Sequence, residues 1–261
     1  MCQFALWVTT PCGSWLILNL GAPGPYDQYV RVATWNLERR KPTTPRGVEA
    51  VDYLHAREAD IAVVTEVRTT FPVRGGNMIF AEKPDPPRFA DDERKIGIWS
   101  RTVLESVEFD SPIDPTRFIA ARTATTAGPI LILGVCIPWH MAGVKANDGP
   151  KTKMWEQHLT YLDHLTEIFA VIDEPMVVAG DFNQRYPRQK QSRKVAEALE
   201  ATFNNLDILT AGIIDGCARH GIDHIAISPH LEATSVSGWP HDATGNRLSD
   251  HDGAMSELEF R

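Results

Sequence analysis

Side chains that bind metal ions or transfer protons stand at the ends of several apolar runs typical of buried strands. The set comprises Asn36 after VRVATW, Glu66 after IAVVT, His140 after ILGVCIPW, Asp181 and Asn183 after MVVAG, Asp223 before IAIS, and Asp250 with His251 before the last run. Taken singly, each could be a turn or cap residue. Loops at strand ends can gather such side chains into one site, and the repeated placement of Asp, Glu, Asn and His favours that interpretation.

Apolar runs and amphipathic segments alternate from Tyr29 onward, without an internal repeat or a low-complexity linker. The patterns predict helices over Thr44–Ala59, residues 151–172 and Arg188–Thr202, with His158 and His164 solvated on the second helix. Few long helices among many strands indicate stacked sheets flanked by helices, with antiparallel neighbours between residues 76 and 137. The predicted strands are Tyr29–Trp35, Ile61–Thr65, Met78–Ala81, Ile96–Ser100, Val103–Phe109, Phe118–Thr123, Ile130–Ile137, Met176–Ala179, Ile222–Ser228, Leu231–Ser237 and Ala254–Phe260.

Composition is that of a soluble globular protein, with 43% hydrophobic and 23% charged residues in 261. The formal net charge of −8 gives no global positive field that would attract nucleic acid. A metal ion with a few local cations can still bind a polyanion, so nucleic acid stays open as a partner. No C-x-x-C pair occurs, and we expect free thiols at all four cysteines (Cys2, Cys12, Cys136 and Cys217), which favours a reducing compartment.

The first 29 residues carry no charged side chain before Asp27. Their apolar run Trp15–Leu18 is too short to span a bilayer, which takes about 20 residues, and a basic n-region is missing. We therefore treat residues 1–29 as an extension that adds an edge strand or is loosely ordered, and residues 30–261 as the main domain. A degenerate export signal is the alternative. The expected protein is cytoplasmic and monomeric, without stable membrane insertion.

Five segments match, in order, the motifs of the endonuclease/exonuclease/phosphatase superfamily: T-W-N-L (34–37), V-T-E-V (64–67), A-G-D-F-N (179–183), I-D-H-I (222–225) and L-S-D-H-D (248–252). The chain thus resembles deoxyribonucleases and abasic-site endonucleases over residues 30 to 261. The resemblance implies an α+β fold, a four-layer α/β/β/α sandwich of two mixed, mainly antiparallel sheets flanked by helices. It also implies a site at one edge, between the two sheets.

The same resemblance implies a role for each member of the set. Glu66, Asn36 and Asp250 would hold Mg²⁺ (or Mn²⁺), for which hard oxygen ligands are suited. Asp181 would orient or deprotonate a water, and Asn183 would hydrogen-bond a phosphate oxygen. His251 would lie against the scissile phosphate, oriented by Asp223, and His140 would approach the same phosphate, as in deoxyribonuclease-like members. Phosphoester hydrolysis needs these three contributions: charge neutralisation, an aligned water and a protonated leaving oxygen.

Two segments bear on the substrate. Gln184–Lys194 is basic, and Arg185 with Tyr186 could follow a nucleic-acid backbone and stack on a base. The alternative is a solvated loop and helix face. Trp239, in the loop before S-D-H, could contact a base, a sugar or a lipid head group, or could anchor its loop.

Three functions remain open from the sequence. The leading hypothesis is a nuclease or nucleic-acid phosphodiesterase acting on DNA or RNA. The second is a phosphatase or phosphodiesterase acting on a small molecule or a phospholipid head group, similar to sphingomyelinases or inositol phosphatases. The third is a catalytically inactive binding module that keeps the fold.

Overall fold

The computed structural model describes the chain except residues 1–4, 10–14, 20–28, 73, 85–88 and 145–150. Cys2 and Cys12 therefore lie outside the described residues. Near the N-terminus, β1 (Ala5–Thr9) and β2 (Trp15–Asn19) pair antiparallel in a two-stranded sheet of their own. Within the described residues, this segment adds no edge strand to either of the larger sheets.

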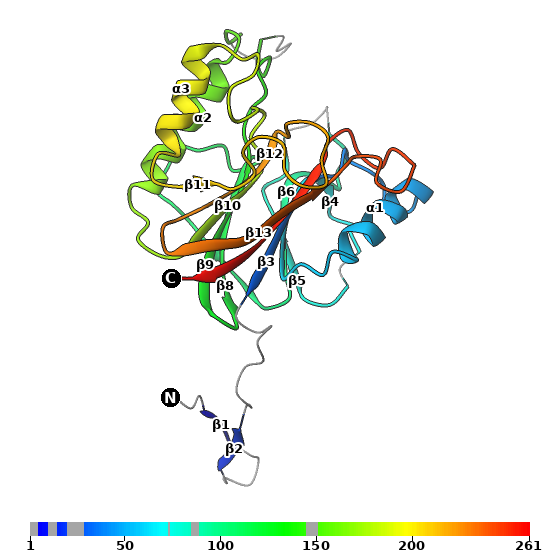
Figure 1. Cartoon of the computed structure of the whole chain (residues 1–261), viewed down its shortest axis with the longest axis vertical. Coiled ribbons are helices and arrows are strands. Elements are labelled where there is room, and N and C mark those ends of the chain that lie inside the picture. Colours follow the sequence, from blue (N-terminus) through cyan, green and yellow to red (C-terminus); the bar gives the residue numbers. More distant parts are fainter. Residues whose placement is uncertain (1–4, 10–14, 20–28, 73, 85–88, 145–150) are drawn as a thin grey trace.

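Two six-stranded sheets form the body of the protein (Figure 1). The β10 sheet contains β7 (Leu104–Val107), β8 (Phe118–Thr125), β9 (Gly128–Cys136), β10 (Met176–Asp181), β11 (Asp207–Ile208) and β12 (Asp223–Ile227), in the order β11-β12-β10-β9-β8-β7. The β3 sheet contains β3 (Val30–Asn36), β4 (Ile61–Arg68), β5 (Asn77–Phe80), β6 (Glu93–Ser100), β13 (Leu231–Trp239) and β14 (Gly253–Phe260), in the order β13-β14-β3-β4-β6-β5.

Each sheet is mixed but mainly antiparallel. The parallel pairs are β9 with β10 in one sheet and β3 with β4 in the other, both near the middle. The remaining pairs are antiparallel, including the expected neighbours between residues 76 and 137.

Three helices in the described part of the chain cover the outer faces of the sandwich. Figure 1 shows α2 (Glu156–Phe169) and α3 (Arg193–Thr202) beside the β10 sheet, and α1 (Pro45–His55) on the side of the β3 sheet. Three clusters of buried apolar residues lie in the interfaces between these layers: one under α2 and α3, one between the sheets and one under α1. The predicted α+β four-layer sandwich is confirmed. No helix within the described ranges is both long and apolar enough to cross a membrane.

Helix boundaries are set by local residues that the periodicity did not reveal. Trp155 has a φ of 68°, so α2 begins at Glu156 and not near residue 151. Ser192 accepts a hydrogen bond from the backbone N–H of Val195, a standard N-cap that starts α3 at Arg193. The basic stretch before Ser192 is therefore loop, although the sequence predicted a helix from residue 188.

Candidate active site

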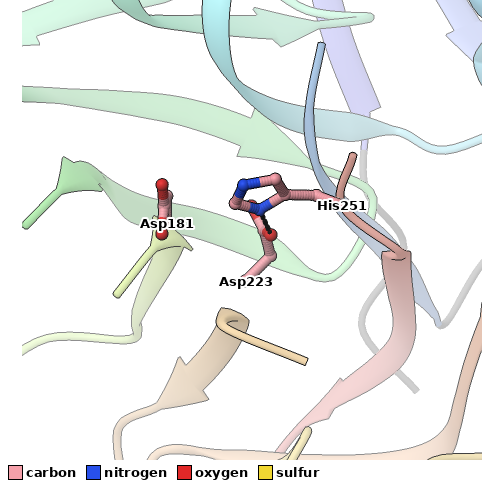
Figure 2. A group of neighbouring side chains, drawn as sticks. All are labelled: Asp181, Asp223 and His251. Carbon is pink, nitrogen blue, oxygen red and sulfur yellow. Dashed lines mark hydrogen bonds and ion pairs between the residues drawn. The ribbon is translucent and has the colours of Figure 1, made fainter. Parts of the chain in front are cut away.

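A cavity of about 780 Å³ opens between the ends of the two sheets. Six of the eight predicted catalytic and metal-binding residues line it: Asn36, Glu66, Asp181, Asn183, Asp250 and His251. A seventh, Asp223, is buried directly behind His251 and forms a hydrogen bond with it. Figure 2 shows Asp181 and Asp223 on neighbouring strands, with the imidazole of His251 reaching towards them from the other sheet.

The register of the strands aligns half of the site residues in a row across the β10 sheet. Asp181 pairs with Asp223 on one side and with Cys136 on the other. Beyond Cys136 comes Arg117, whose carbonyl accepts a hydrogen bond from the Cys136 N–H. We call Asp223, Asp181, Cys136 and Arg117 the β10 row.

A matching row crosses the β3 sheet. His251 precedes β14, and Asn36 ends the adjacent strand β3. Thr65 pairs with Ile96 and Val67 with Arg94, so Glu66 lies opposite Lys95. We call His251, Asn36, Glu66 and Lys95 the β3 row. The two rows face each other, because His251 bonds to Asp223 and Asn36 Nδ2 lies 3.4 Å from Asp181 Oδ2.

His251 and Asp223 form a buried carboxylate–imidazole pair. His251 Nδ1 donates to Asp223 Oδ2, and Asp223 is only 3% exposed. Burial alone would lower the pKa of His251, but Asp223, with smaller contributions from Asp181 and Asp250, raises that pKa to about 10. His251 is therefore a cation at neutral pH. Its backbone is also fixed, since Trp35 Nε1 donates to its carbonyl at 2.9 Å.

Asp181 is buried beside this pair. Burial and then the neighbouring Asp223 raise the pKa of Asp181 to about 7. Its Oδ1 accepts the backbone N–H of Asn183 at 2.8 Å. Gly180 allows this position, because its φ is 136° and a Cβ there would lie 2.0 Å from the Val135 carbonyl oxygen.

Asn183 has a left-handed backbone (φ 52°), a conformation found at many functional sites. Its side-chain Nδ2 donates one hydrogen to the carbonyl of Ile137 at 2.9 Å, and the residue lines the cavity. Glu66 has a similar φ of 48° at the end of β4. Neither residue is a glycine, so the surrounding structure must impose both conformations.

The oxygen-rich end of the cavity fits a divalent cation. Glu66, Asn36 and Asp250 contribute carboxylate and amide oxygens, which are hard ligands. Glu66 is also held by Arg39, whose Nη2 lies 2.9 Å from Glu66 Oε2. Burial, and then the neighbouring Asp223, raise the pKa of Asp181, and a nearby cation would favour its charged form.

A second grouping of possible metal ligands is Asp181, Asp223 and His251, whose ligand atoms lie within 4.8 Å of one another. Since Asp223 already bonds to His251 Nδ1, this group is better explained as the carboxylate–imidazole pair next to Asp181. The predicted ligands Glu66, Asn36 and Asp250 are not part of this grouping.

Two histidines that the sequence analysis did not assign to the site hold its loops. His158, 0% exposed, donates from Nδ1 to the Pro138 carbonyl at 2.7 Å and accepts at Nε2 from Gln184 Nε2 at 2.6 Å. His224 Nε2 donates to the Gln184 carbonyl at 2.9 Å. The expectation that His158 is solvated was wrong. Its spacing from Tyr161, at i+3, already placed it on the buried stripe of the helix.

Besides Asp223 and Trp239, three predicted residues lie outside the cavity lining. His140 is exposed, with its ring 5.1 Å from that of Trp139 and 5.5 Å from that of Trp155. Arg185 is also exposed, and Tyr186 packs against the apolar cluster under α2 and α3. Within the described residues, it is Trp139, half exposed, that contributes an indole to the cavity.

Trp239 is a core residue, and the prediction that it contacts substrate is wrong. It is 2% exposed and packs edge-on against Trp35, with ring centroids 5.6 Å apart. Gly253 makes room for the indole, since a Cβ there would lie 2.1 Å from the ring. The loop-anchoring alternative agrees with this position.

Cavity residues that the sequence analysis missed include the cations Arg39, Lys95 and Arg117. Lys95 sits in a strand whose alternation shows which side chains share a face, but the pattern alone does not show which face meets the cavity. Cys136 also lines the cavity as a free, buried thiol, as expected, and burial raises its pKa to about 12. Neither Lys95 nor Arg117 carried a motif signal.

The sequence pattern of the Endonuclease/Exonuclease/phosphatase family matches residues 33–251. No match was found among curated proteins. Similar solved structures include an AP endonuclease from Archaeoglobus fulgidus (16% identity, covering 87% of this chain and 98% of that one, TM-score 0.64). Another is the 3′ phosphatase NExo from Neisseria bound to a product DNA hairpin (19% identity, 89% and 99% covered, TM-score 0.62).

The catalytic domain of human Nocturnin with a bound sulfate anion is similar to the same degree (19% identity, 90% and 95% covered, TM-score 0.62). At these identities, the structural likeness establishes the fold alone. The sequence pattern covers most of the chain and includes the residues that meet in the cavity. The chain therefore belongs to the endonuclease/exonuclease/phosphatase family of metal-dependent phosphoesterases.

Proposed function

We propose that this protein is a Mg²⁺- or Mn²⁺-dependent hydrolase that cleaves a phosphoester of DNA or RNA. The observation that carries the proposal is the meeting of the His251–Asp223 pair, Asp181 and Asn183 in one cavity beside the oxygens of Glu66. This arrangement offers a cation, a carboxylate and an amide to one phosphate.

Each residue has a distinct task in this proposal. Glu66, Asn36 and Asp250 would hold the metal ion, which would neutralise charge on the phosphoryl oxygens. Asp181 accepts a hydrogen bond from the attacking water and takes its proton, which its raised pKa favours. Asn183 donates its second Nδ2 hydrogen to a phosphate oxygen. His251, held protonated by Asp223, donates to the negative charge that develops on the phosphoryl group or the leaving oxygen.

Support for nucleic acid comes from the cavity and from two relatives. Trp139 presents a half-exposed indole on which a base can stack, and Lys95 and Arg117 add positive charge. The similar structures include an AP endonuclease and a phosphatase bound to product DNA. Because the net charge is −8, binding of a polyanion would depend on cations within the cavity and not on the whole surface.

A small phosphorylated molecule is the second candidate. A cavity of about 780 Å³ can enclose one, and the basic loop with Arg185 lies outside its lining. Exposed Arg185 and half-buried Tyr186 remain proposed contacts only for a longer substrate that extends past the cavity.

A metal-dependent activity screen tests the function. Purified protein is assayed on DNA, RNA, phosphoinositides and sphingomyelin with Mg²⁺ and Mn²⁺. We expect cleavage of DNA or RNA that EDTA abolishes and that Asp181→Asn reduces by about a thousandfold or more. Asp163→Asn, an exposed position on α2, is the matched control and should retain full activity. Hydrolysis of the lipid or inositol substrates alone would establish the second candidate, and inactivity on every substrate would favour a binding module.

A further inference from the structure

Carboxylates are concentrated at one end of the site. There Asp223 and Asp181 lie beside the cationic His251 and the Asn36 amide, and Glu66 follows one strand further along. At the other end stand Lys95 and Arg117, one from each sheet, and both line the cavity. An anion that enters the cavity therefore meets a cationic end that the proposed hydrolytic steps do not use.

Lys95 is largely enclosed, with 12% of its side chain exposed. Its Nζ lies 3.9 Å from Glu66 Oε1, a long contact, while Arg39 already pairs with the other Glu66 oxygen at 2.9 Å. The ammonium also lies 4.6 Å from the centre of the Phe89 ring. Among the described residues, no other carboxylate comes within 4.0 Å of it. Neutralising Glu66 is thus not the main use of this charge.

Arg117 is anchored so that its guanidinium is held at the cavity wall. Nη1 donates to the Cys136 carbonyl at 3.2 Å, and Nε lies 3.5 Å from the half-exposed Asp114 carboxylate. Within the described part of the chain, Arg117 makes its side-chain polar contacts through Nε and Nη1, so Nη2 remains available to a ligand. Its backbone carbonyl accepts from the Tyr161 hydroxyl at 2.6 Å, so the strand end is fixed as well.

We propose that Lys95 and Arg117 form a second-phosphate subsite, which binds a phosphate of the substrate other than the one hydrolysed. Neighbouring strands lie about 4.8 Å apart. Lys95 is one strand from Glu66, and Arg117 is two strands from Asp181, so the backbone positions of the two cations lie about 5 to 10 Å from those of the residues proposed to surround the reacting phosphate. Two phosphates on one nucleoside, or on adjacent nucleotides of a strand, span such a distance.

The subsite deepens the proposed hydrolytic function and rests on it for the position of the first phosphate. It assigns the substrate to the class of phosphoesters with a second phosphate nearby. A neighbouring backbone phosphate of a polynucleotide and a second phosphate on a free nucleotide share this chemistry, and the experiment below separates them.

Binding of two nucleotides tests the subsite without turnover. In the Asp181→Asn background with Mg²⁺, calorimetry measures the affinities of thymidine 3′,5′-bisphosphate and thymidine 5′-monophosphate. We expect the bisphosphate to bind about tenfold or more tightly, as charge-assisted hydrogen bonds to one further phosphate would give. Lys95→Met and Arg117→Met should each bring the ratio of affinities close to one, while affinity for the monophosphate changes little.

Arg94→Met is the matched control, because Arg94 is the neighbouring cation on β6 and does not line the cavity. It should leave the ratio unchanged. Lys95→Arg and Arg117→Lys, which keep the charge, should restore at least part of the ratio and guard against a variant that fails to fold. A ratio near one in the parent protein, or one that neither Met variant alters, would overturn the subsite.

Oligonucleotides identify the source of the second phosphate. If it belongs to a polymer, Lys95→Met weakens binding of a native single strand but not of one whose flanking linkages are uncharged methylphosphonates. If it belongs to a free nucleotide, Lys95→Met alters only the bisphosphate. If the Met variants bring the ratio of bisphosphate to monophosphate affinity close to one but the protein hydrolyses no substrate, the subsite is supported and the proposed function is rejected. If the protein hydrolyses a substrate but the Met variants leave this ratio unchanged, the function is supported and the subsite is rejected.

Discussion

The two loops that carry the reacting groups are held by different kinds of interaction. After β10, the loop with Asp181 and Asn183 is fixed through Gln184, whose amide and carbonyl bond to His158 and His224. Both histidines act as neutral groups, because burial lowers their pKa values to about 4. No ion pair is needed to hold Gln184 in place.

The loop before β14 is held by charges. Arg219 donates to both carboxylate oxygens of Asp252, at 2.9 and 3.1 Å, and to the Asp250 carbonyl at 3.1 Å. His241 Nδ1 lies 3.0 Å from Asp252 as well. The next residue back, His251, is held by the buried carboxylate of Asp223.

This difference separates two requirements of the site. The loop after β10 must place a carboxylate whose own charge is reactive, and neutral supports leave that charge undisturbed. The loop before β14 must hold His251 as a cation, and a buried carboxylate provides this. The comparison predicts that different substitutions impair the two loops. It also predicts that their contributions to stability are lost at opposite ends of the pH scale.

The largest expected effect is on the charged loop. Asp223→Asn removes the carboxylate that keeps His251 protonated, so kcat should fall by about a thousandfold on the substrate found in the screen. The alkaline limb of kcat/KM should also move down from about pH 10 by more than one unit. An unchanged alkaline limb in Asp223→Asn would show that His251 does not depend on this pair.

The neutral loop is tested by His158→Leu. The substitution leaves the Pro138 carbonyl and the Gln184 amide buried without their partner, which should reduce the free energy of unfolding by about 3 kcal/mol. Urea unfolding at pH 7 measures it. His164→Leu, on the same helix but away from Gln184, should cost much less. Equal losses in the two variants would mean that the hydrogen bonds contribute nothing beyond helix packing.

The two loops also predict a dependence of stability on pH, which is gradual and not a loss at one pH. The pKa values of His158 and His224 are about 4 when folded and ordinarily 6.5, so the unfolded chain binds more protons between these values. Stability should therefore fall by about 1 kcal/mol per histidine for each pH unit below 6.5, until about pH 4. His158→Gln should show a shallower slope in urea titrations between pH 7 and 5. An identical slope would exclude His158 as a source.

The pH dependence has the opposite sign for His251. Its folded pKa of about 10 exceeds the ordinary 6.5, so its contribution is complete below pH 6.5 and is lost as the pH rises through 10. Asp223→Asn should remove this alkaline loss and leave the acid slope of His158 and His224 unaltered. If both slopes changed together, the two loops would not be independent.

Much of the site could be predicted because strand ends and motif order are local features. Asp181 and Asn183 follow an apolar run that is fully buried as β10, and the register of that strand with β12 brings Asp223 beside Asp181. The layer order also followed, since few helices and many short strands leave little choice of architecture.

What could not be predicted depends on contacts between layers. Trp139 and His140 are adjacent aromatic residues on one loop, and only the path of that loop decides that Trp139 lines the cavity. From the sequence alone, Lys95 looks like an exposed residue of a strand. Only the pairing of β6 with β4 brings it opposite Glu66. The left-handed backbone of Glu66 has no sequence signature, because the surrounding fold imposes it on a non-glycine residue.

The alignment of the two rows on strand ends limits how the gene can change. A single-residue insertion or deletion within β10 would turn Asp181 to the opposite face and separate it from Asp223. The same holds for β3 with Asn36. Changes of length are therefore tolerated between strands, as in the segment from Gln184 to Ser192. In evolutionary terms, descendants of this chain could acquire new substrates by remodelling loops while the spacing of the reacting residues is inherited unchanged.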